Sequence, residues 1–255
     1  MPMRHATILA ALVIATTTLP ATHAPAQDLV GDRPDFTESA LAVPAGGWQI
    51  EAGATITTLD ALDTTEIGEV LVRHGLKPGT ELRLVLPSFV DVSHDGDQID
   101  DVSGLGNAAI GLKQELARGD GSRPQVAMVG HVTLPVGDED VASDDTAVDL
   151  ALALEWELSP RVGLGMNVGG EAVFADDTET RQWASAALGL DLGAGFGAFV
   201  EGYTFTDGFD DFSSYVDAGL TYLIAPDWQV DARVGQGLGD VDDETFFGAG
   251  LVTRF

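Results

Sequence analysis

The chain contains no cysteine. That absence excludes disulfide bonds, cysteine-ligated metal sites and catalysis by a thiol nucleophile. Positive charge is also scarce, because Lys and Arg number 12 against 41 Asp and Glu, and lysine occurs only at Lys77 and Lys113. The formal net charge of −29 argues against a nucleic-acid partner, since binding to phosphates needs charge of the opposite sign.

Long apolar runs are missing from most of the chain. An uncharged run at residues 6–20 follows Arg4 and His5 and leads into Ala24-Pro25-Ala26. A helix that spans a membrane needs about 20 apolar residues, and this run is shorter. A basic start, a short apolar run and an A-x-A site are typical of a cleaved export signal. We therefore predict a signal peptide over residues 1–26 and export of the mature chain.

From residue 48 onward, apolar and polar side chains alternate with period two. The clearest example places Val148, Leu150 and Leu152 on one face and Asp149 and Glu155 on the other. Segments of about ten residues with this alternation are the length that a tilted strand needs to cross a bilayer. We predict an all-β fold, an antiparallel transmembrane β-barrel over residues 48–255. Its twelve strands are residues 48–58, 65–76, 81–91, 104–116, 125–136, 146–158, 162–174, 182–193, 196–206, 214–224, 228–237 and 245–255.

The connections between these strands alternate in chemistry. Every second connection is strongly acidic, at residues 91–101, 138–145, 176–179, 207–211 and 240–244. The other connections are short and turn-like, at residues 77–79, 159–161, 193–195 and 225–227, with a longer exception at 118–124. A transmembrane barrel with longer outer loops and short periplasmic turns predicts this alternation. The pattern favours the bacterial outer membrane over a soluble β-sandwich.

The charged side chains of the predicted strands gather on one face. A charge facing lipid at mid-depth costs about 2–4 kcal/mol for Arg or Lys, so this face must line a polar lumen. The predicted lumen residues are Glu51, Arg73, Arg83, Lys113, Glu115, His131, Asp149, Glu171, Glu201, Asp217, Asp231 and Arg233, together with Glu81, Glu155, Glu157, Asp191 and Arg254.

The C-terminal strand ends the chain on an aromatic residue. Phe247, Leu251 and Phe255 lie on one face of the alternation, and Gly250 lies on the other. We interpret this strand as the closing strand, with Gly250 and Phe255 as an assembly signal for the barrel-assembly machinery. Thr253 occupies a position where such a signal usually carries a large hydrophobic residue.

The start of the mature chain carries the most specific motif. Residues 31–39 read GDRPDFTES and residues 43–53 read VPAGGWQIEAG. This opening resembles the family named for the meta-pathway of phenol degradation. The resemblance continues at residues 72–76, 81–84, 111–113, 199–201 and 230–238, and so covers nearly the whole mature chain. It implies an outer-membrane transporter barrel for hydrophobic or aromatic compounds.

Two interpretations of the lumen stay open. Its charges form either an ion-pair lattice that closes the bore or a constricted pore that prefers cations. Residues 27–47 precede the first strand as a periplasmic lead-in or as a plug. In the second case residues 32–39 enter the barrel and Arg33 pairs with a lumen carboxylate.

We expect passive uptake of small molecules, and the alternative is a non-conducting structural or adhesive barrel. Catalysis is not expected, because the chain has no G-x-S-x-G, P-loop or dinucleotide motif. No cofactor or metal site is predicted, although residues 95–97 and 242–244 offer oxygen ligands for loosely held cations. The predicted partners are outer-membrane lipid, lipopolysaccharide, the assembly machinery and a small solute.

Overall fold

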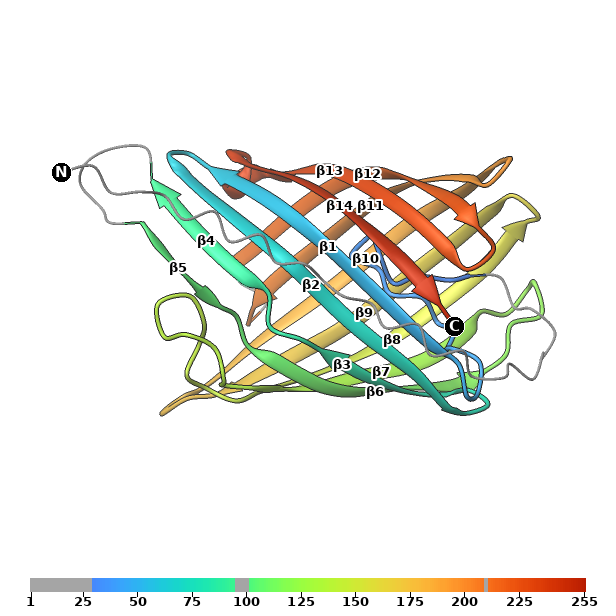
Figure 1. Cartoon of the computed structure of the whole chain (residues 1–255), viewed down its shortest axis with the longest axis horizontal. Helices are drawn as coiled ribbons and strands as arrows, with labels where there is room; N and C mark the ends of the chain where they lie inside the picture. Colours follow the sequence, from blue (N-terminus) through green and yellow to red (C-terminus); the bar gives the residue numbers. More distant parts are fainter. Residues whose placement is uncertain (1–28, 95–100, 209–210) are drawn as a thin grey trace.

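The structure is a computed structural model that describes residues 29–94, 101–208 and 211–255. The predicted signal peptide and residues 95–97 lie outside the described residues. The chain forms one antiparallel sheet, and β1 pairs with both β2 and β14, which closes the sheet into a barrel (Figure 1). The strands are β1 Trp48–Leu59, β2 Leu62–Lys77, β3 Thr80–Val85, β4 Phe89–His94, β5 Val102–Leu105, β6 Ala108–Ala117, β7 Gln125–Leu134, β8 Ala147–Ser159, β9 Val162–Phe174, β10 Thr178–Gly193, β11 Phe196–Asp207, β12 Asp211–Ala225, β13 Trp228–Leu238 and β14 Glu244–Arg254, with a 3-10 turn η1 at Gly239–Val241.

The fourteen strands form the twelve staves of the barrel, because β3 with β4 and β5 with β6 each count as one interrupted strand. The predicted twelve-stranded antiparallel barrel is therefore confirmed. β3 and β4 follow one another along β2, and the break between them holds Pro87, which has no N–H to give to the ladder. Opposite this break, β2 bulges at Gly68 and Glu69, whose φ angles are 112° and 35°. β5 and β6 are separated by Gly106 and Asn107 in the same way.

The last strand closes the barrel against the first. β14 pairs with β1 from Gln49 with Arg254 through Leu59 with Glu244. The ends are joined by a pair of hydrogen bonds, since Trp48 N donates to Phe255 O and Phe255 N to Trp48 O, both at 2.9 Å. The alternation at the C-terminus therefore predicted the closing strand correctly.

Three strands begin earlier than the apolar pattern predicted. β2 begins at Leu62, β10 at Thr178 and β12 at Asp211, where the prediction began at residues 65, 182 and 214. Most residues of these extensions are polar, and they pair through the backbone and through contacts such as the 2.6 Å hydrogen bond from Thr58 Oγ1 to Asp63 Oδ1. Periodicity in hydrophobic residues carries no signal where a strand extends beyond the apolar band.

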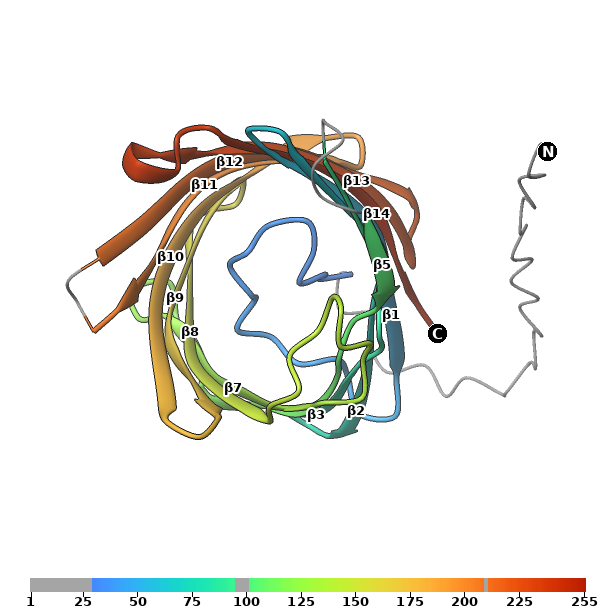
Figure 2. The same cartoon turned by 90° about the vertical axis from the view of Figure 1, so that its left-hand side faces the viewer.

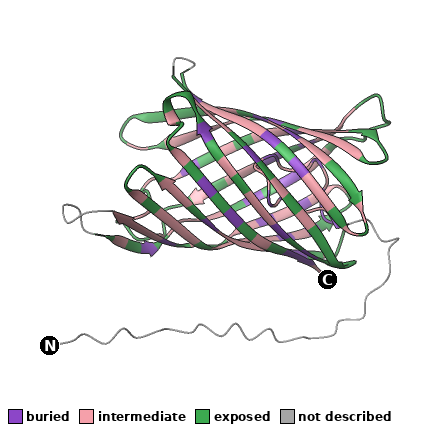
Figure 3. Ribbon diagram, turned by 90° about the horizontal axis from the view of Figure 1, so that it is seen from above, coloured by how far each residue is buried: buried purple, intermediate pink, exposed green. Residues whose placement is uncertain are grey.

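The barrel reverses the usual distribution of polar and apolar residues. Outward-facing side chains such as Leu112, Leu220 and Val234 are more than half exposed, as a surface against lipid requires. The largest fully buried side chains are, with the exception of Val252, charged or polar: Arg73, Arg83, Lys113, Gln49, Glu51 and Glu81. Figure 3 shows buried and exposed residues alternating along the strands.

Residues 29–47, called the N-terminal segment from here on, lie inside the barrel. Figure 2 shows this segment in blue within the ring of strands. Where it passes into β1, Gly46 N donates to Gly75 O at 2.7 Å and Gly75 N to Gly47 O at 3.0 Å. A Cβ atom at Gly75 would lie 2.1 Å from the oxygen of Pro44, so glycine is needed at this crossing.

Candidate channel interior

The N-terminal segment is irregular, and its backbone N–H groups donate to side chains of the barrel wall. Without such partners these buried groups would each cost several kcal/mol, of order 2–7. The bonds are Asp32 N to Glu51 at 3.0 and 3.1 Å, Phe36 N and Thr37 N to Glu201 at 2.7 Å each, Glu38 N to Asn167 at 2.7 Å, Ala40 N to Glu155 at 3.2 Å, Ala42 N to Glu115 at 3.0 Å and Val43 N to Glu81 at 2.7 Å. Their acceptors come from β1, β3, β6, β8, β9 and β11, so the segment is held from most sides of the lumen.

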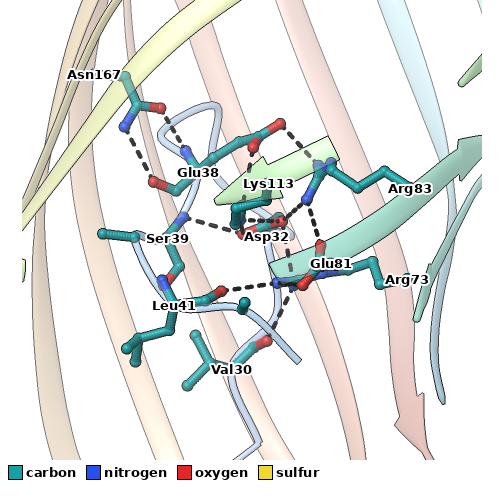
Figure 4. A network of polar contacts seen from close by, with 12 residues as sticks. Val30, Asp32, Glu38, Ser39, Leu41, Arg73, Glu81, Arg83, Lys113 and Asn167 are labelled. Carbon is teal, nitrogen blue, oxygen red and sulfur yellow. Dashed lines mark hydrogen bonds and ion pairs between the residues drawn. The ribbon is translucent and has the colours of Figure 1, made fainter. Parts of the chain in front are cut away.

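Asp32 lies at the centre of the interior contacts (Figure 4). Its Oδ2 atom lies 2.6 Å from Arg83 Nη1 and 3.1 Å from Arg73 Nη1, and Lys113 Nζ lies 2.9 Å from both carboxylate oxygens. Ser39 N donates to Oδ1 at 3.0 Å. The side chains of all three cations are at most 2% exposed. The carboxylate of Asp32 therefore contributes negative charge to a cluster of cations that water does not reach.

The two arginines also bind carboxylates of the wall. Arg73 Nε lies 2.8 Å from Glu81 Oε1, and its Nη1 lies 2.8 Å from Glu51 Oε1. Arg83 Nη1 lies 3.0 Å from Glu81 Oε1, and its Nη2 lies 2.9 Å from Glu38 Oε1 of the segment. The cluster is thus a continuous network of ion pairs between β1, β2, β3, β6 and the segment.

A histidine extends this network toward β8. Arg83 Nε donates to His131 Nε2 at 2.9 Å, and His131 Nδ1 lies 3.1 Å from Asp149 Oδ2. Because Nε2 accepts a hydrogen bond, the imidazole holds its proton on Nδ1 and donates it to Asp149. The ring therefore orients the guanidinium that binds Asp32.

The two aspartates of the segment have opposite pKa shifts. Burial alone would raise the pKa of Asp32, but the charges of Arg73, Lys113 and Arg83 hold it well below its usual value. Burial raises the pKa of Asp35 well above its usual value, and the nearby charge of Glu201 raises it further. Asp32 is therefore held as an anion, whereas Asp35 is held as a neutral acid.

Arg33 pairs with acids on β2 and β13, the strands that flank the closing pair β1 and β14. Its Nη1 lies 2.8 Å from Glu69 Oε2 and its Nη2 lies 3.5 Å from Asp231 Oδ1. The guanidinium rests on the backbone of two glycines, since a Cβ atom at Gly53 would lie 2.3 Å from Arg33 Cζ and one at Gly250 would lie 2.4 Å from Arg33 Nε.

Aromatic side chains line another part of the inner wall. Phe36 of the segment stacks on Tyr203 at 4.7 Å between ring centroids, and Tyr203 stacks on Tyr215 at 5.0 Å. Phe205 meets Phe36 edge to face at 5.3 Å. These aromatic residues are absent from the predicted lumen set, which was chosen from the charged residues of the inward face. The alternation that turns Glu201 inward also turns residues 203 and 205 inward, and that signal was available.

The predicted lumen residues divide into groups in the structure. Glu51, Arg73, Glu81, Arg83 and Lys113 meet at Asp32, while Glu115, Glu155 and Glu201 accept bonds from the segment backbone. Asp231 pairs with Arg33, His131 with Asp149, and Arg233 with Asp217 at 3.8 Å.

The remaining predicted lumen residues lie nearer the two ends of the barrel. Glu157 and Asp191 are exposed, and Arg254 lies 3.2 Å from Asp227 at a turn. Glu171 is half-buried and makes no side-chain hydrogen bond within the described residues. The predicted lumen residues therefore do not form one site.

Both openings of the barrel are narrowed by loops. The exceptional connection at residues 118–124 folds on itself, because Asp120 Oδ1 accepts hydrogen bonds from Ser122 N and Arg123 N at 3.2 and 2.9 Å. A cavity of about 190 Å³ lies beneath it, lined by Leu41, Gly119, Gly121, Arg123, Gln125, Glu155 and Glu157.

At the other end, the acidic loop between β7 and β8 packs against β5. Asp138 Oδ2 accepts a hydrogen bond from Leu105 N at 2.7 Å, and Asp138 N donates to Leu105 O at 2.8 Å. Figure 2 shows this loop, in yellow-green, inside the ring of strands. It therefore narrows the opening opposite the end that holds Phe255 (Figure 1).

Within residues 29–94, 101–208 and 211–255, no group of three or more His, Asp and Glu side chains is arranged to hold a metal ion. No helix in the same residues is long and apolar enough to cross a membrane.

The closed wall, the lipid-facing apolar surface and the charged interior define a transmembrane β-barrel of the outer-membrane type. Residues 31–255 match the model of the family described as "Putative MetA-pathway of phenol degradation", and the chain belongs to this family. The resemblance seen in the sequence is thereby confirmed. No curated protein matches the chain.

Solved structures with the same architecture are outer-membrane channels and porins. The barrel is similar to the COG4313 outer membrane channel from Pseudomonas putida F1, with a TM-score of 0.69 and 15% identity over 84% of this chain and 97% of that chain. It is also similar to the KdgM porin, with a TM-score of 0.55 and 9% identity over 80% and 99% of the two chains. The NanC porin gives a TM-score of 0.54 and 9% identity over 80% and 98%. At these identities the likeness concerns the fold.

Proposed function

We propose that the chain is a passive outer-membrane channel for small molecules and that the N-terminal segment is its plug. The observation that carries the proposal is the way the segment is held. Its polar bonds to the wall are hydrogen bonds and ion pairs of its own backbone and of the side chains of Asp32, Arg33, Thr37, Glu38 and Ser39. Such contacts break without unfolding the barrel, whose strands are joined by their own ladder of hydrogen bonds.

The class of solute follows from the family and from the aromatic wall. The family's name refers to phenol degradation, and the structure adds Tyr203, Phe205 and Tyr215 on the inner face. Aromatic side chains favour flat apolar rings, so we extend the proposal to small aromatic solutes. The proposal includes no catalysis.

The rival function is a non-conducting barrel with a structural or adhesive role. The ion pairs around Asp32 favour it, since a permanently filled lumen also satisfies every buried charge there. Conduction after controlled release of the segment separates the two functions.

The absence of native cysteine allows a reversible lock. A Cβ atom at Gly165 would lie 3.1 Å from Thr37 Cγ2, which brings the pair Thr37→Cys and Gly165→Cys within reach of a disulfide. We expect the oxidised variant in planar bilayers to remain closed and the reduced one to show discrete conductance steps. Comparison of one protein in two redox states controls for any other effect of the substitutions.

A correctly inserted barrel that stays silent in both redox states would reject the channel and favour the structural role. Heat-modifiable mobility on gels establishes that the barrel has folded. As further partners we propose lipopolysaccharide at the acidic loops and the barrel-assembly machinery at the C-terminal strand. The membrane location itself follows from the barrel fold.

A further inference from the structure

Lys113 is a buried cation that lies across from Glu81 in the ladder between β3 and β6 and makes its ion pairs with the N-terminal segment. Its side chain has no exposed area, and its ion pairs within the described residues are with Asp32 at 2.9 Å and Glu38 at 3.7 Å. Both partners belong to the segment. A buried charge that loses its partner is destabilising by about 3–5 kcal/mol. When the segment leaves, another anion is therefore favoured at Lys113.

The wall side chains that meet at Asp32 carry an excess of positive charge among themselves. The cations are Arg73, Arg83 and Lys113, and the carboxylates are Glu51 and Glu81, which lie 2.8–3.0 Å from the arginines. Among these five side chains one positive charge is left over in the absence of the segment, and Asp149 reaches Arg83 only through His131. The interior of a protein with a net charge of −29 thus contains a locally cationic site.

Asp32 shows how that site binds a carboxylate. One carboxylate receives contacts from two guanidinium groups at 2.6 and 3.1 Å and from an ammonium at 2.9 Å. Charge-assisted hydrogen bonds of this kind are about twice as strong as neutral ones. Figure 4 shows that the cations come from the wall and converge on this group. Nothing in the contacts requires the carboxylate to belong to the protein chain.

We propose that the cluster Arg73, Arg83 and Lys113 binds the carboxylate of a transported solute, and that Asp32 occupies this place while the channel is closed. The inference rests on the proposed function, because a solute reaches the cluster only when the segment moves. It deepens that function by naming the solute class, a small organic carboxylate.

The proposal gives the solute a role in opening the channel. A ligand that binds only the open state shifts the equilibrium toward that state by its differential affinity. The solute carboxylate and Asp32 compete for the same three cations. The acidic outer loops do not prevent this competition, because exposed charges are screened within about 8 Å at physiological salt and buried pairs are screened much less.

Competition is tested by binding of benzoate to the full-length barrel in detergent, measured by calorimetry. Benzyl alcohol has the same ring without the charge and serves as the neutral probe. In Asp32→Asn the competing charge is gone, and we expect benzoate to bind at least about tenfold more tightly than to the wild type, which corresponds to about 1.4 kcal/mol. Benzyl alcohol should bind both proteins alike.

The cations are tested in the Asp32→Asn background. Lys113→Gln should lose the gain in benzoate affinity, while Arg83→Lys keeps the charge and should retain most of it. The control is Arg161→Ala, which removes an exposed arginine from the turn between β8 and β9. We expect this control to leave benzoate binding unchanged.

Equal benzoate affinity in the wild type, Asp32→Asn and the Lys113→Gln double variant overturns the carboxylate site. An equal gain for benzyl alcohol overturns it too, because the site would then recognise the ring. The binding assay needs no conduction, so the two proposals fail separately. A silent barrel whose Asp32→Asn form gains benzoate affinity rejects the channel and keeps the site.

Discussion

The guanidinium of Arg33 lies directly over Gly53, where a Cβ atom would come within 2.3 Å of Arg33 Cζ. Gly53 pairs with Gly250 across the closing seam between β1 and β14, and Arg33 covers both. Gly250 is also predicted to be part of an assembly signal, and that role stays a prediction. Contact with Arg33 is a second physical reason for glycine at that position.

Substitution Gly53→Ala should loosen the plug. The new methyl group displaces Arg33 from Glu69, its partner at 2.8 Å, and hydrogen bonds to charged groups contribute about 1.5–3 kcal/mol. We expect open probability in planar bilayers to rise about ten- to a hundredfold. Gly189→Ala is the matched control, since a Cβ atom there meets no atom within 4 Å. In an Arg33→Ala background, Gly53→Ala should add nothing, and an unchanged effect there would place its cause elsewhere.

Glu201 anchors the middle of the segment. Its carboxylate accepts backbone hydrogen bonds from Phe36 and Thr37 at 2.7 Å each, and Thr37 Oγ1 also donates to it. Glu201→Gln removes the charge that strengthens these bonds, so we expect an increase in open probability of about tenfold or more. Glu157→Gln changes an exposed glutamate of β8 and should have no effect. Equal conductance in the two variants would show that Glu201 does not hold the segment.

How far the sequence could predict this interior depends on the kind of contact. Period-two alternation turns Arg83, Lys113 and Glu201 inward, and the strand pattern therefore placed the walls of the site correctly. It could not predict that Lys113 meets Asp32, because 81 residues separate them and the segment follows no period. The segment's backbone donors carry no sequence signal at all, since every residue but proline has an N–H.

The same limit applies to the breaks in the wall. Residues 81–91 alternate well enough to be predicted as one strand, yet Pro87 and the bulge at Gly68 divide it into β3 and β4. Proline marks a break in a strand, but which neighbouring strand bulges to match it depends on tertiary pairing.

Asp35 should make the closure sensitive to pH. Its docked pKa is raised well above its usual value by burial and by Glu201, with smaller contributions from Asp217 and Asp32. Docking therefore takes up a proton at any pH between the usual and the raised pKa, and it weakens as pH rises through that range, by up to about 1.4 kcal/mol per pH unit. The pKa of Asp32 is lowered in the docked state, so its contribution to docking weakens as pH falls. That loss occurs only at pH below the usual pKa of an aspartate.

We therefore expect conductance to increase as pH rises above the usual pKa of an aspartate toward the raised pKa of docked Asp35. In Asp35→Asn the neutral amide cannot lose a proton, so this variant should stay closed across the range and show a flatter profile. Wild type and variant are compared in the same bilayers at constant ionic strength. A profile of the same slope in Asp35→Asn would assign the pH dependence to wall carboxylates such as Glu201.

The acidic loop between β7 and β8 should set the ion preference of the open channel. Glu139, Asp140 and Asp144 are exposed on this loop, whereas Asp138 is kept because it binds Leu105. Replacing the three by their amides in the Gly53→Ala channel should lower the cation-to-anion permeability ratio about twofold or more. Reversal potentials measure this ratio.

The salt dependence of the permeability ratio shows whether the loop charges act electrostatically. The Debye length falls from about 30 Å at 0.01 M salt to about 3 Å at 1 M. The difference between the loop variant and its parent should therefore be large in dilute salt and nearly vanish in concentrated salt. Glu157→Gln, at the end of the barrel that holds Phe255, serves as the charge control. A loop effect that persists in 1 M salt would mean that the substitutions alter the shape of the opening rather than its field.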